Sequence, residues 1–265
     1  AFIVIFLVSC SQPDQEWNSY GMDLSNQRFS RITQINKTNV ETLEMAWQVQ
    51  TGVPATFQST PIVHEGVMFV SLPFNNVLAL DAKTGNEIWR YEHDLNPNWK
   101  LCCGPSNRGV ALQGKQLFFG TVDARLISLN IKTGEKIWDI NVVKNNVETE
   151  SISDLDETDA NSDKQVSGGT GVGISMAPVV YNGKVIIGIT GVGYGLHVEE
   201  EGSNTPLGAV VGVSGKYGRS GFLAAYDIHS GQQIWQFNTI LKSGWEGNFN
   251  NFIEDGLTLN RDIYH

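Results

Sequence analysis

The fold is decided by the stretch Asp81-Ala82-Lys83-Thr84-Gly85-Asn86-Glu87-Ile88-Trp89, because close copies of it recur twice further along the chain. An alternating apolar run precedes each copy, which is the period of a half-buried β-strand. The Thr/Ser-Gly step suits a hairpin turn in which glycine takes a positive φ. The tryptophan that ends each copy is large and flat enough to pack between neighbouring sheets. The other copies span 130–138 and 227–235, and the apolar runs span 77–80, 126–129 and 222–226.

A second hairpin is predicted upstream of each copy, so each repeat unit is expected to form four short antiparallel strands. Units of about 40–50 residues built in this way are typical of β-propeller blades. The sequence therefore indicates an all-β fold, a β-propeller of which only the first few blades are present. The predicted upstream turns are Glu65-Gly66, Gln113-Gly114 and Asn182-Gly183.

Three segments depart from the repeat. Thr38-Asn39-Val40-Glu41 predicts a helix capping box, with a short helix continuing into Leu43 and Trp47. Residues 142–173 and 194–220 interrupt the repeats, and long loops on a rigid scaffold often carry function. The first interruption is rich in acids but lacks the spacing of an EF-hand. It is interpreted as a solvated loop, with cation binding as the alternative.

The composition suits an exported β-rich protein. Of 265 residues, 28 are glycine, 10% are aromatic and only 17% are charged, a mixture that favours strands. The net charge of -10 argues against an extended nucleic-acid-binding surface.

The first residues resemble the end of a signal peptide. Ala1 to Val8 are almost wholly apolar, and Leu7-Val8-Ser9-Cys10 resembles the lipobox in which the cysteine is lipidated. The alternative is a buried N-terminal strand with an incidental Cys10. We expect 1–9 to be the end of a truncated signal peptide, 10–16 a lipid-anchored tether, and 17–265 a partial propeller. This predicts a periplasmic outer-membrane lipoprotein of a Gram-negative bacterium.

The run from Cys102-Cys103 to Arg108 is the strongest candidate for chemistry. If Cys10 is lipidated, the adjacent cysteines can bond only to each other within the chain, and export permits oxidation. Such a vicinal disulfide is strained, because neighbouring Cα atoms lie about 3.8 Å apart. Two reduced, buried cysteines are the alternative. Arg108 can bind a carboxylate through its planar guanidinium, or form a surface ion pair.

With these motifs the chain resembles the quinoprotein alcohol dehydrogenases of the methanol/ethanol type, which use pyrroloquinoline quinone (PQQ). The resemblance covers nearly everything after Cys10 and is most specific in Cys102-Cys103 and Asn107-Arg108-Gly109. It implies an eight-bladed propeller with the quinone on its axis beside a metal ion. It also implies that a vicinal disulfide packs on one face of the quinone and a tryptophan on the other.

The resemblance also suggests cofactor-binding residues, one position at a time. Cys102 and Cys103 match the disulfide, and Arg108 matches an arginine that contacts the cofactor. Gln58 stands where the family usually has a glutamate, and Ser175 stands where it has a threonine. Gly191 and Val192 would run along the cofactor through their backbone. The matched positions are Gln58, Cys102, Cys103, Arg108, Ser175, Gly191 and Val192.

Gly193 departs from the family pattern, since a metal-binding glutamate is expected there. A calcium or lanthanide ion is then held differently, is absent, or takes an acid from 199–201. The catalytic aspartate and the stacking tryptophan of the family would lie beyond residue 265. No catalytic residue is therefore expected in this fragment, and His64, His93, His197 and His229 are interpreted as turn or surface residues.

The resemblance implies an oxidoreductase that oxidises a small alcohol with PQQ and passes electrons to a c-type cytochrome. The main alternative is a non-enzymatic outer-membrane assembly or scaffold lipoprotein with PQQ-like repeats. A scaffold has no reason to keep Cys102-Cys103 or Asn107-Arg108-Gly109, so these residues favour the enzyme. A third possibility is a degenerate family member that has lost its metal ion and its activity.

Overall fold

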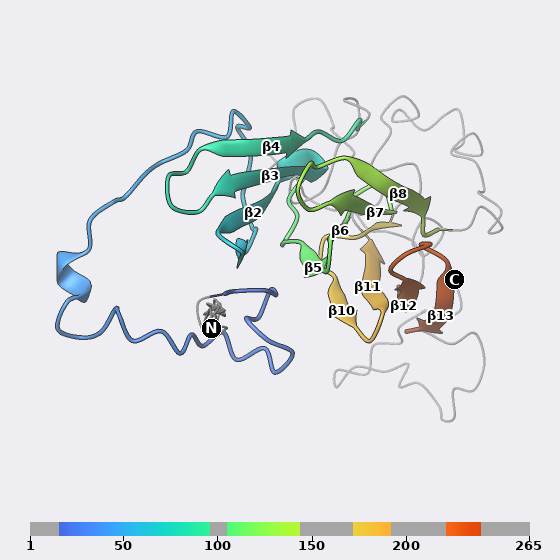
Figure 1. Ribbon diagram of the computed structural model, residues 1–265. Helices are drawn as coiled ribbons and strands as arrows, with labels where there is room; N and C mark the ends of the chain where they lie inside the picture. Colours follow the sequence, from blue (N-terminus) through green and yellow to red (C-terminus); the bar gives the residue numbers. More distant parts are fainter. Residues whose placement is uncertain (1–15, 96–104, 144–171, 192–220, 240–265) are drawn as a thin grey trace, which may run out of the picture.

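The computed structural model describes residues 16–95, 105–143, 172–191 and 221–239 (Figure 1). These residues form three antiparallel sheets, each built on four strands in chain order. The sequence prediction of four-stranded units is confirmed, and the third sheet gains a fifth strand, β9 (Val172–Gly173), which pairs with β11. The first sheet contains β1 (Ile62–His64), β2 (Val67–Leu72), β3 (Asn76–Asp81) and β4 (Glu87–Tyr91). The second contains β5 (Ala111–Gln113), β6 (Gln116–Gly120), β7 (Arg125–Asn130) and β8 (Lys136–Asn141). The third contains β10 (Val179–Tyr181), β11 (Lys184–Gly191), β12 (Phe222–Asp227) and β13 (Gln233–Asn238).

The turn between the last two strands of each sheet is built by the repeated motif. In the first sheet, the Asp81 carboxylate accepts hydrogen bonds from the backbone N–H and the hydroxyl of Thr84, at 2.7 and 2.8 Å. These bonds, led by that of the Thr84 hydroxyl, lower the pKa of Asp81. The strand register shifts at the turn, and Gly85 has φ +74°. The other two sheets show the same register shift and a glycine with positive φ.

Trp89 and Trp138, which end the first two copies of the motif, each pack against the turn glycine of the next sheet along the chain, and each donates its indole N–H to a carbonyl of that turn, at 3.0 and 2.9 Å. Trp235, which ends the third copy, is 41% exposed. The prediction that the tryptophans pack between sheets is therefore confirmed for Trp89 and Trp138. Trp47, upstream of the first sheet, makes the same contact and donates to the Ala82 carbonyl at 3.2 Å. The pairs are Trp47 with Gly85, Trp89 with Gly134 and Trp138 with Gly231.

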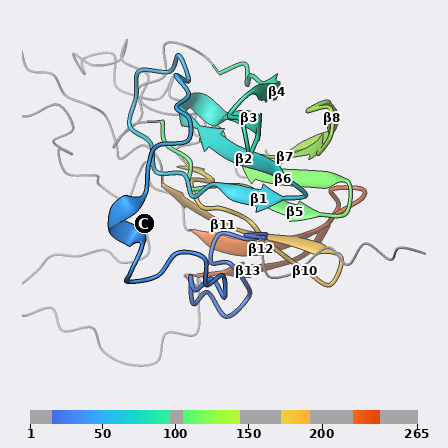
Figure 2. The same ribbon diagram turned by 60° about the vertical axis from the view of Figure 1, so that its left-hand side comes forward.

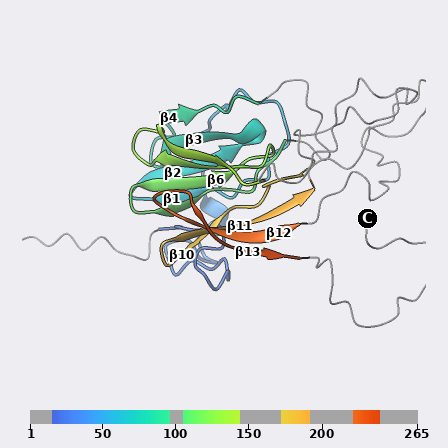
Figure 3. The ribbon, with the colours of Figure 1, turned by 90° about the vertical axis from the view of Figure 1, so that its right-hand side faces the viewer.

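The apolar core lies between the sheets, which stack face to face (Figures 2 and 3). One cluster joins the first and second sheets and includes Phe69 and Phe119. Another joins the second and third sheets and includes Phe118 and Ile187. All five residues of β6 are buried because the middle sheet is covered on both faces. Burial of these side chains is the main force that holds the sheets together.

Strand alternation places the loops that lead into β1, β5 and β10 at one edge of the stack. We call this the leading edge: loops 58–61, 105–110 and 174–178, with the turns 73–75 and 121–124. Backbone bonds join its parts: Phe74 N–H donates to the Pro105 carbonyl, and Ile174 N–H to the Thr121 carbonyl, at 3.0 and 2.8 Å. The opposite edge, the trailing edge, carries the hairpin turns at 65–66, 113–114 and 182–183.

The prediction of a helix that continues into Leu43 and Trp47 is wrong. In this segment the structure has only a single 3-10 turn, Val40–Thr42, and the residue before it makes no side-chain capping bond. The Thr38 hydroxyl instead bonds to the Asn36 carboxamide at 2.6 Å. Such local side-chain turns compete with helix capping. The chain then extends, so that Trp47 reaches the turn of the first sheet.

Along the described parts of the chain, no helix is long and apolar enough to cross a membrane.

Candidate functional site

The three loops of the leading edge lie side by side and are joined through their backbones. The Thr60 N–H donates to the Arg108 carbonyl at 3.0 Å, and the Arg108 N–H donates to the Ser175 carbonyl at 3.0 Å. Each loop leads into a different sheet, so this row of three bonded loops depends on how the sheets stack. Arg108 is its central member and is tied on both sides.

The side chain of Arg108 is exposed and is oriented by Ser175. One guanidinium nitrogen donates to the Ser175 hydroxyl at 2.8 Å, with a longer contact of 3.4 Å to the Ser175 carbonyl. The structure thus brings together two of the residues that the sequence singled out, although they are 67 positions apart. The surface ion pair considered for Arg108 is not found among the residues that the structure describes. Among the described residues, the side chain that holds the guanidinium is a neutral hydroxyl.

Gln58 belongs to the adjacent loop of the same row. It is exposed and stands two residues before Thr60, whose N–H bonds to Arg108. Its loop is anchored by Ser59, whose hydroxyl accepts from the backbone N–H of Ser71 at 3.2 Å. Gln58 therefore offers a neutral amide one loop away from the charged guanidinium.

Gly109 allows the three loops to approach this closely. Its φ is +148°. A Cβ at this position would lie 3.3 Å from both the Ala177 Cβ and the Thr60 carbonyl oxygen, tighter than ordinary van der Waals contact. Glycine is needed here both for its φ and for the close approach of the neighbouring loops.

The other predicted site residues are placed only in part. Gly191 is the last residue of β11, where its backbone pairs with Val172. Cys102, Cys103, Val192, Gly193 and the lipidation candidate Cys10 lie outside the described residues. So do His197 and the acid-rich segment of the first interruption.

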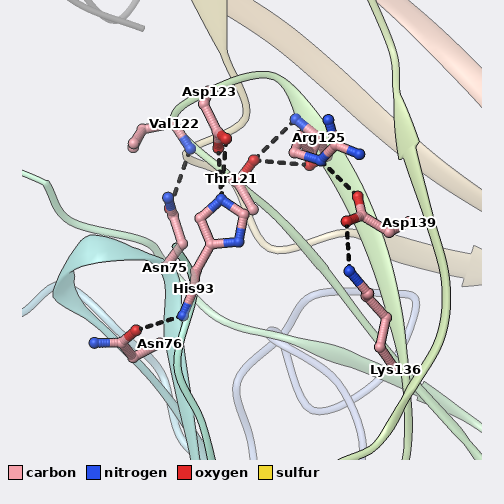
Figure 4. A network of polar contacts seen from close by, with 9 residues as sticks. All are labelled: Asn75, Asn76, His93, Thr121, Val122, Asp123, Arg125, Lys136 and Asp139. Carbon is pink, nitrogen blue, oxygen red and sulfur yellow. Dashed lines mark hydrogen bonds and ion pairs between the residues drawn. The ribbon is translucent and has the colours of Figure 1, made fainter. Parts of the chain in front are cut away.

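A second polar cluster lies where the first two sheets meet at the leading edge (Figure 4). His93 Nε2 contacts the two carboxylate oxygens of Asp123 at 2.9 and 3.1 Å, and the side chains are 7% and 11% exposed. The interpretation of His93 as a turn or surface residue is therefore wrong. The neighbouring Arg125 bonds to Asp139 at 2.6 Å. Both pairs line a hollow of about 430 Å³.

Burial and hydrogen bonding shift two pKa values in this cluster. Burial raises the pKa of Tyr91 to about 12, so its hydroxyl stays protonated at neutral pH. Burial also raises the pKa of Asp123, but hydrogen bonds from His93 and Thr121 outweigh it, and the net pKa is lowered. Asp123 is therefore a carboxylate at neutral pH and contributes a charge to the contact between the sheets.

No group of three or more His, Cys, Asp or Glu side chains that could hold a metal ion occurs within the described ranges. Arg108, Ser175 and Gln58 instead offer a guanidinium, a hydroxyl and an amide, a set of groups that can donate hydrogen bonds to an anion. Sequence reasoning missed the pairing of His93 with Asp123, because the two are 30 positions apart. Alignment of the repeats was the available signal, since it places both at the same edge of adjacent sheets.

Comparison with known proteins shows to which family the chain is similar. The β-propeller domain of the glucose/ethanol/alcohol dehydrogenases, named PQQ, matches residues 17–252. The chain is 33% identical over 231 residues to quinohemoprotein alcohol dehydrogenase ADH IIB of Pseudomonas putida, covering 86% of this chain and 27% of that protein. It thus spans about a quarter of the length of that relative.

Solved structures agree with this assignment. The quinohemoprotein alcohol dehydrogenase from Comamonas testosteroni superposes with a TM-score of 0.62 at 30% identity, covering 85% of this chain and 27% of that one. A europium-containing methanol dehydrogenase superposes with the same TM-score at 25% identity, covering 86% and 32%. The predicted family and fold are confirmed. The chain belongs to the PQQ family of glucose/ethanol/alcohol dehydrogenase β-propeller domains.

Proposed function

We propose that the leading edge of this chain forms part of a PQQ site, and that the protein oxidises alcohols. The observation that carries the proposal is Arg108, whose backbone is bonded to loops of both neighbouring sheets and whose exposed guanidinium is oriented by Ser175. The relatives that the chain matches are quinoprotein and quinohemoprotein alcohol dehydrogenases, which supports the choice of ligand.

The donors at the leading edge fit this cofactor. PQQ is a planar quinone that carries carboxylates, and a guanidinium is the side chain best suited to bind a carboxylate through two parallel hydrogen bonds. Arg108 is exposed at the point where a ligand could reach it. Gln58 and Ser175 add neutral groups on either side, and the close approach of the loops at Gly109 leaves a narrow, continuous row.

The residues of this chain bind and orient the cofactor. Bound PQQ would supply the two-electron acceptor for alcohol oxidation. Arg108 holds a carboxylate, the Ser175 hydroxyl fixes the direction of the guanidinium, and Gln58 offers a polar contact without charge. Cys102 and Cys103, as a disulfide, would cover one face of the quinone, while Gly191 and Val192 would contact it through their backbone.

The proposal also covers the metal ion, the electron acceptor and the location of the protein. The position where a metal-binding glutamate is expected holds Gly193, which has no carboxylate to offer. A calcium or lanthanide ion would therefore need oxygen ligands from other residues. Electrons would pass to a c-type cytochrome. Lipidation of Cys10 would hold the protein at the periplasmic side of the outer membrane.

The proposal is tested by equilibrium binding of PQQ to the full-length protein, with calcium, with lanthanum and without added metal. We expect saturable binding and dye-linked oxidation of primary alcohols. Arg108→Lys keeps the charge but loses the planar guanidinium, and we expect it to weaken binding about tenfold. Arg125→Lys is the matched control, because Arg125 belongs to the second cluster at the same edge.

Absence of saturable PQQ binding under every metal condition would contradict the proposal and favour the scaffold alternative, which requires no cofactor. Equal losses for Arg108→Lys and Arg125→Lys would contradict the role given to Arg108. Mass spectrometry of the unreduced protein tests the disulfide, because the pair should be two hydrogens lighter than the dithiol.

A further inference from the structure

A buried amide, Asn107, precedes the proposed ligand-binding arginine in the chain. It is 2% exposed. Its Nδ2 donates to the carbonyl of Gly120, the last residue of β6, at 2.7 Å, and its Oδ1 accepts from the Gly109 N–H at 2.8 Å. One partner offers only an acceptor and the other only a donor, so the orientation of the amide is determined.

These two bonds hold the backbone on both sides of Arg108. The bond to Gly120 ties the residue before Arg108 to the end of a fully buried strand. The bond to Gly109 fixes the residue after it. The N–H and carbonyl of Arg108 itself are already used by Ser175 and Thr60. The Asn107 amide therefore adds two further contacts to the stretch of backbone from which the guanidinium extends.

Ser71 extends the same arrangement to the neighbouring loop. It lies on β2, is 2% exposed, and its Oγ is 3.0 Å from Ser59 Oγ and 3.5 Å from the Asn107 carbonyl oxygen. The second contact is the longer and weaker one. Ser59 directly follows Gln58, so one buried hydroxyl lies between the backbones that carry Gln58 and Arg108.

We propose that Asn107 is a positioning residue for PQQ, acting through Arg108, and that Ser71 couples this position to Gln58. This inference rests on the proposed function of the leading edge. Asn107 does not touch the cofactor; it sets where the guanidinium meets a carboxylate. At metal sites, removal of the outer groups that orient the ligating side chains lowers affinity by about tenfold or more, and we expect an effect of similar size here.

The test is a double-mutant cycle in the full-length protein: wild type, Asn107→Ala, Arg108→Ala and the double variant. The dissociation constant of PQQ, the absorption band of the bound quinone and the melting temperature without cofactor are measured. We expect Asn107→Ala to weaken binding about tenfold and to shift the band as Arg108→Ala does. The double variant should bind no more weakly than Arg108→Ala, because the two residues act through one contact.

Gln116→Ala is the matched control. Gln116 stands at the other end of β6, is 9% exposed, and its amide also makes two bonds, to Ser128 Oγ at 3.0 Å and to the Ile228 carbonyl at 2.9 Å. We expect a comparable loss of melting temperature with PQQ affinity within about twofold of wild type. Ser71→Ala removes one hydroxyl without a large cavity, and should weaken binding about threefold even if Asn107→Ala fails to fold.

Each failure has its own signature. If the wild type does not bind PQQ, the proposed function falls and this inference falls with it. If the wild type binds PQQ but the affinity losses of Asn107→Ala and Arg108→Ala multiply in the double variant, the role of Asn107 is only structural. The same conclusion follows if Gln116→Ala weakens binding as much as Asn107→Ala. If Ser71→Ala binds like wild type, the proposed coupling of this position to Gln58 is wrong.

Discussion

Substitution of the turn glycine in the second sheet should reveal how much the tryptophan contact stabilises the stack. Gly134 has φ +72°, and a Cβ there would lie 2.6 Å from Cε3 of Trp89. Gly114 has φ +58°, and a Cβ there would meet nothing within 4 Å. Gly134→Ala therefore combines backbone strain with a clash, whereas Gly114→Ala has the strain alone.

The expected losses follow from these two situations. Placing alanine in the left-handed region costs about 1–2 kcal/mol at either position. At Gly134 the indole of Trp89 must also move, and overpacking of this kind costs about 1–3 kcal/mol. The movement lengthens its hydrogen bond to the Ile131 carbonyl, now 3.0 Å, a bond worth about 1 kcal/mol. Gly134→Ala should thus lose about 2–3 kcal/mol more than Gly114→Ala.

The assay is equilibrium unfolding in urea, followed by tryptophan fluorescence, with melting temperatures as a second measurement. For a protein of this size the extra loss corresponds to about 5–10 °C. If unfolding is irreversible, unfolding rates replace equilibrium free energies. Equal losses for the two variants would refute the reasoning, because the clash with Trp89 is all that separates them.

Three further outcomes are expected. Trp89→Phe should lose about 1–2 kcal/mol, measured by urea unfolding, because its carbonyl acceptor in the next sheet loses its donor. Asp123→Asn should be less stable than wild type at neutral pH, since the pKa of Asp123 is lowered in the folded state; this difference should shrink as the pH falls below about 4 and vanish once the pH passes below the lowered pKa of the folded state. Ser175→Ala should weaken PQQ binding about fivefold in a titration while the melting temperature stays near that of wild type, because only the orientation of Arg108 is lost.

The sheets were predictable from local sequence because each signal is short-range. Alternating apolar runs identify strands, and Thr84-Gly85 with its copies identifies the turns, all within about ten residues of chain. The helix predicted from Thr38 failed on an equally local contact, the bond between Thr38 and Asn36. A capping motif and a side-chain turn use the same residue types, so sequence spacing does not separate them.

The candidate site could not be derived from spacing alone. The contact between Arg108 and Ser175 joins residues 67 positions apart, and only the family resemblance pointed to both. Asn107 was noted as part of a motif, but its partner is a backbone carbonyl of β6, which carries no sequence signal. The pairing of His93 with Asp123 likewise depends on how two sheets stack, and no local pattern encodes that.

Directional polar contacts, rather than the apolar core, determine how the leading edge is aligned. Apolar burial is not directional, so it tolerates small sliding of one sheet against the next. The Ile228 carbonyl accepts from both the Gln116 amide and the Trp138 indole, each at 2.9 Å, and anchors the trailing edge. Asn107 and Arg108 anchor the leading edge from the opposite end of β6. Because the two sets lie at opposite ends of one rigid strand, stability can be lost at one while the arginine at the other keeps its place.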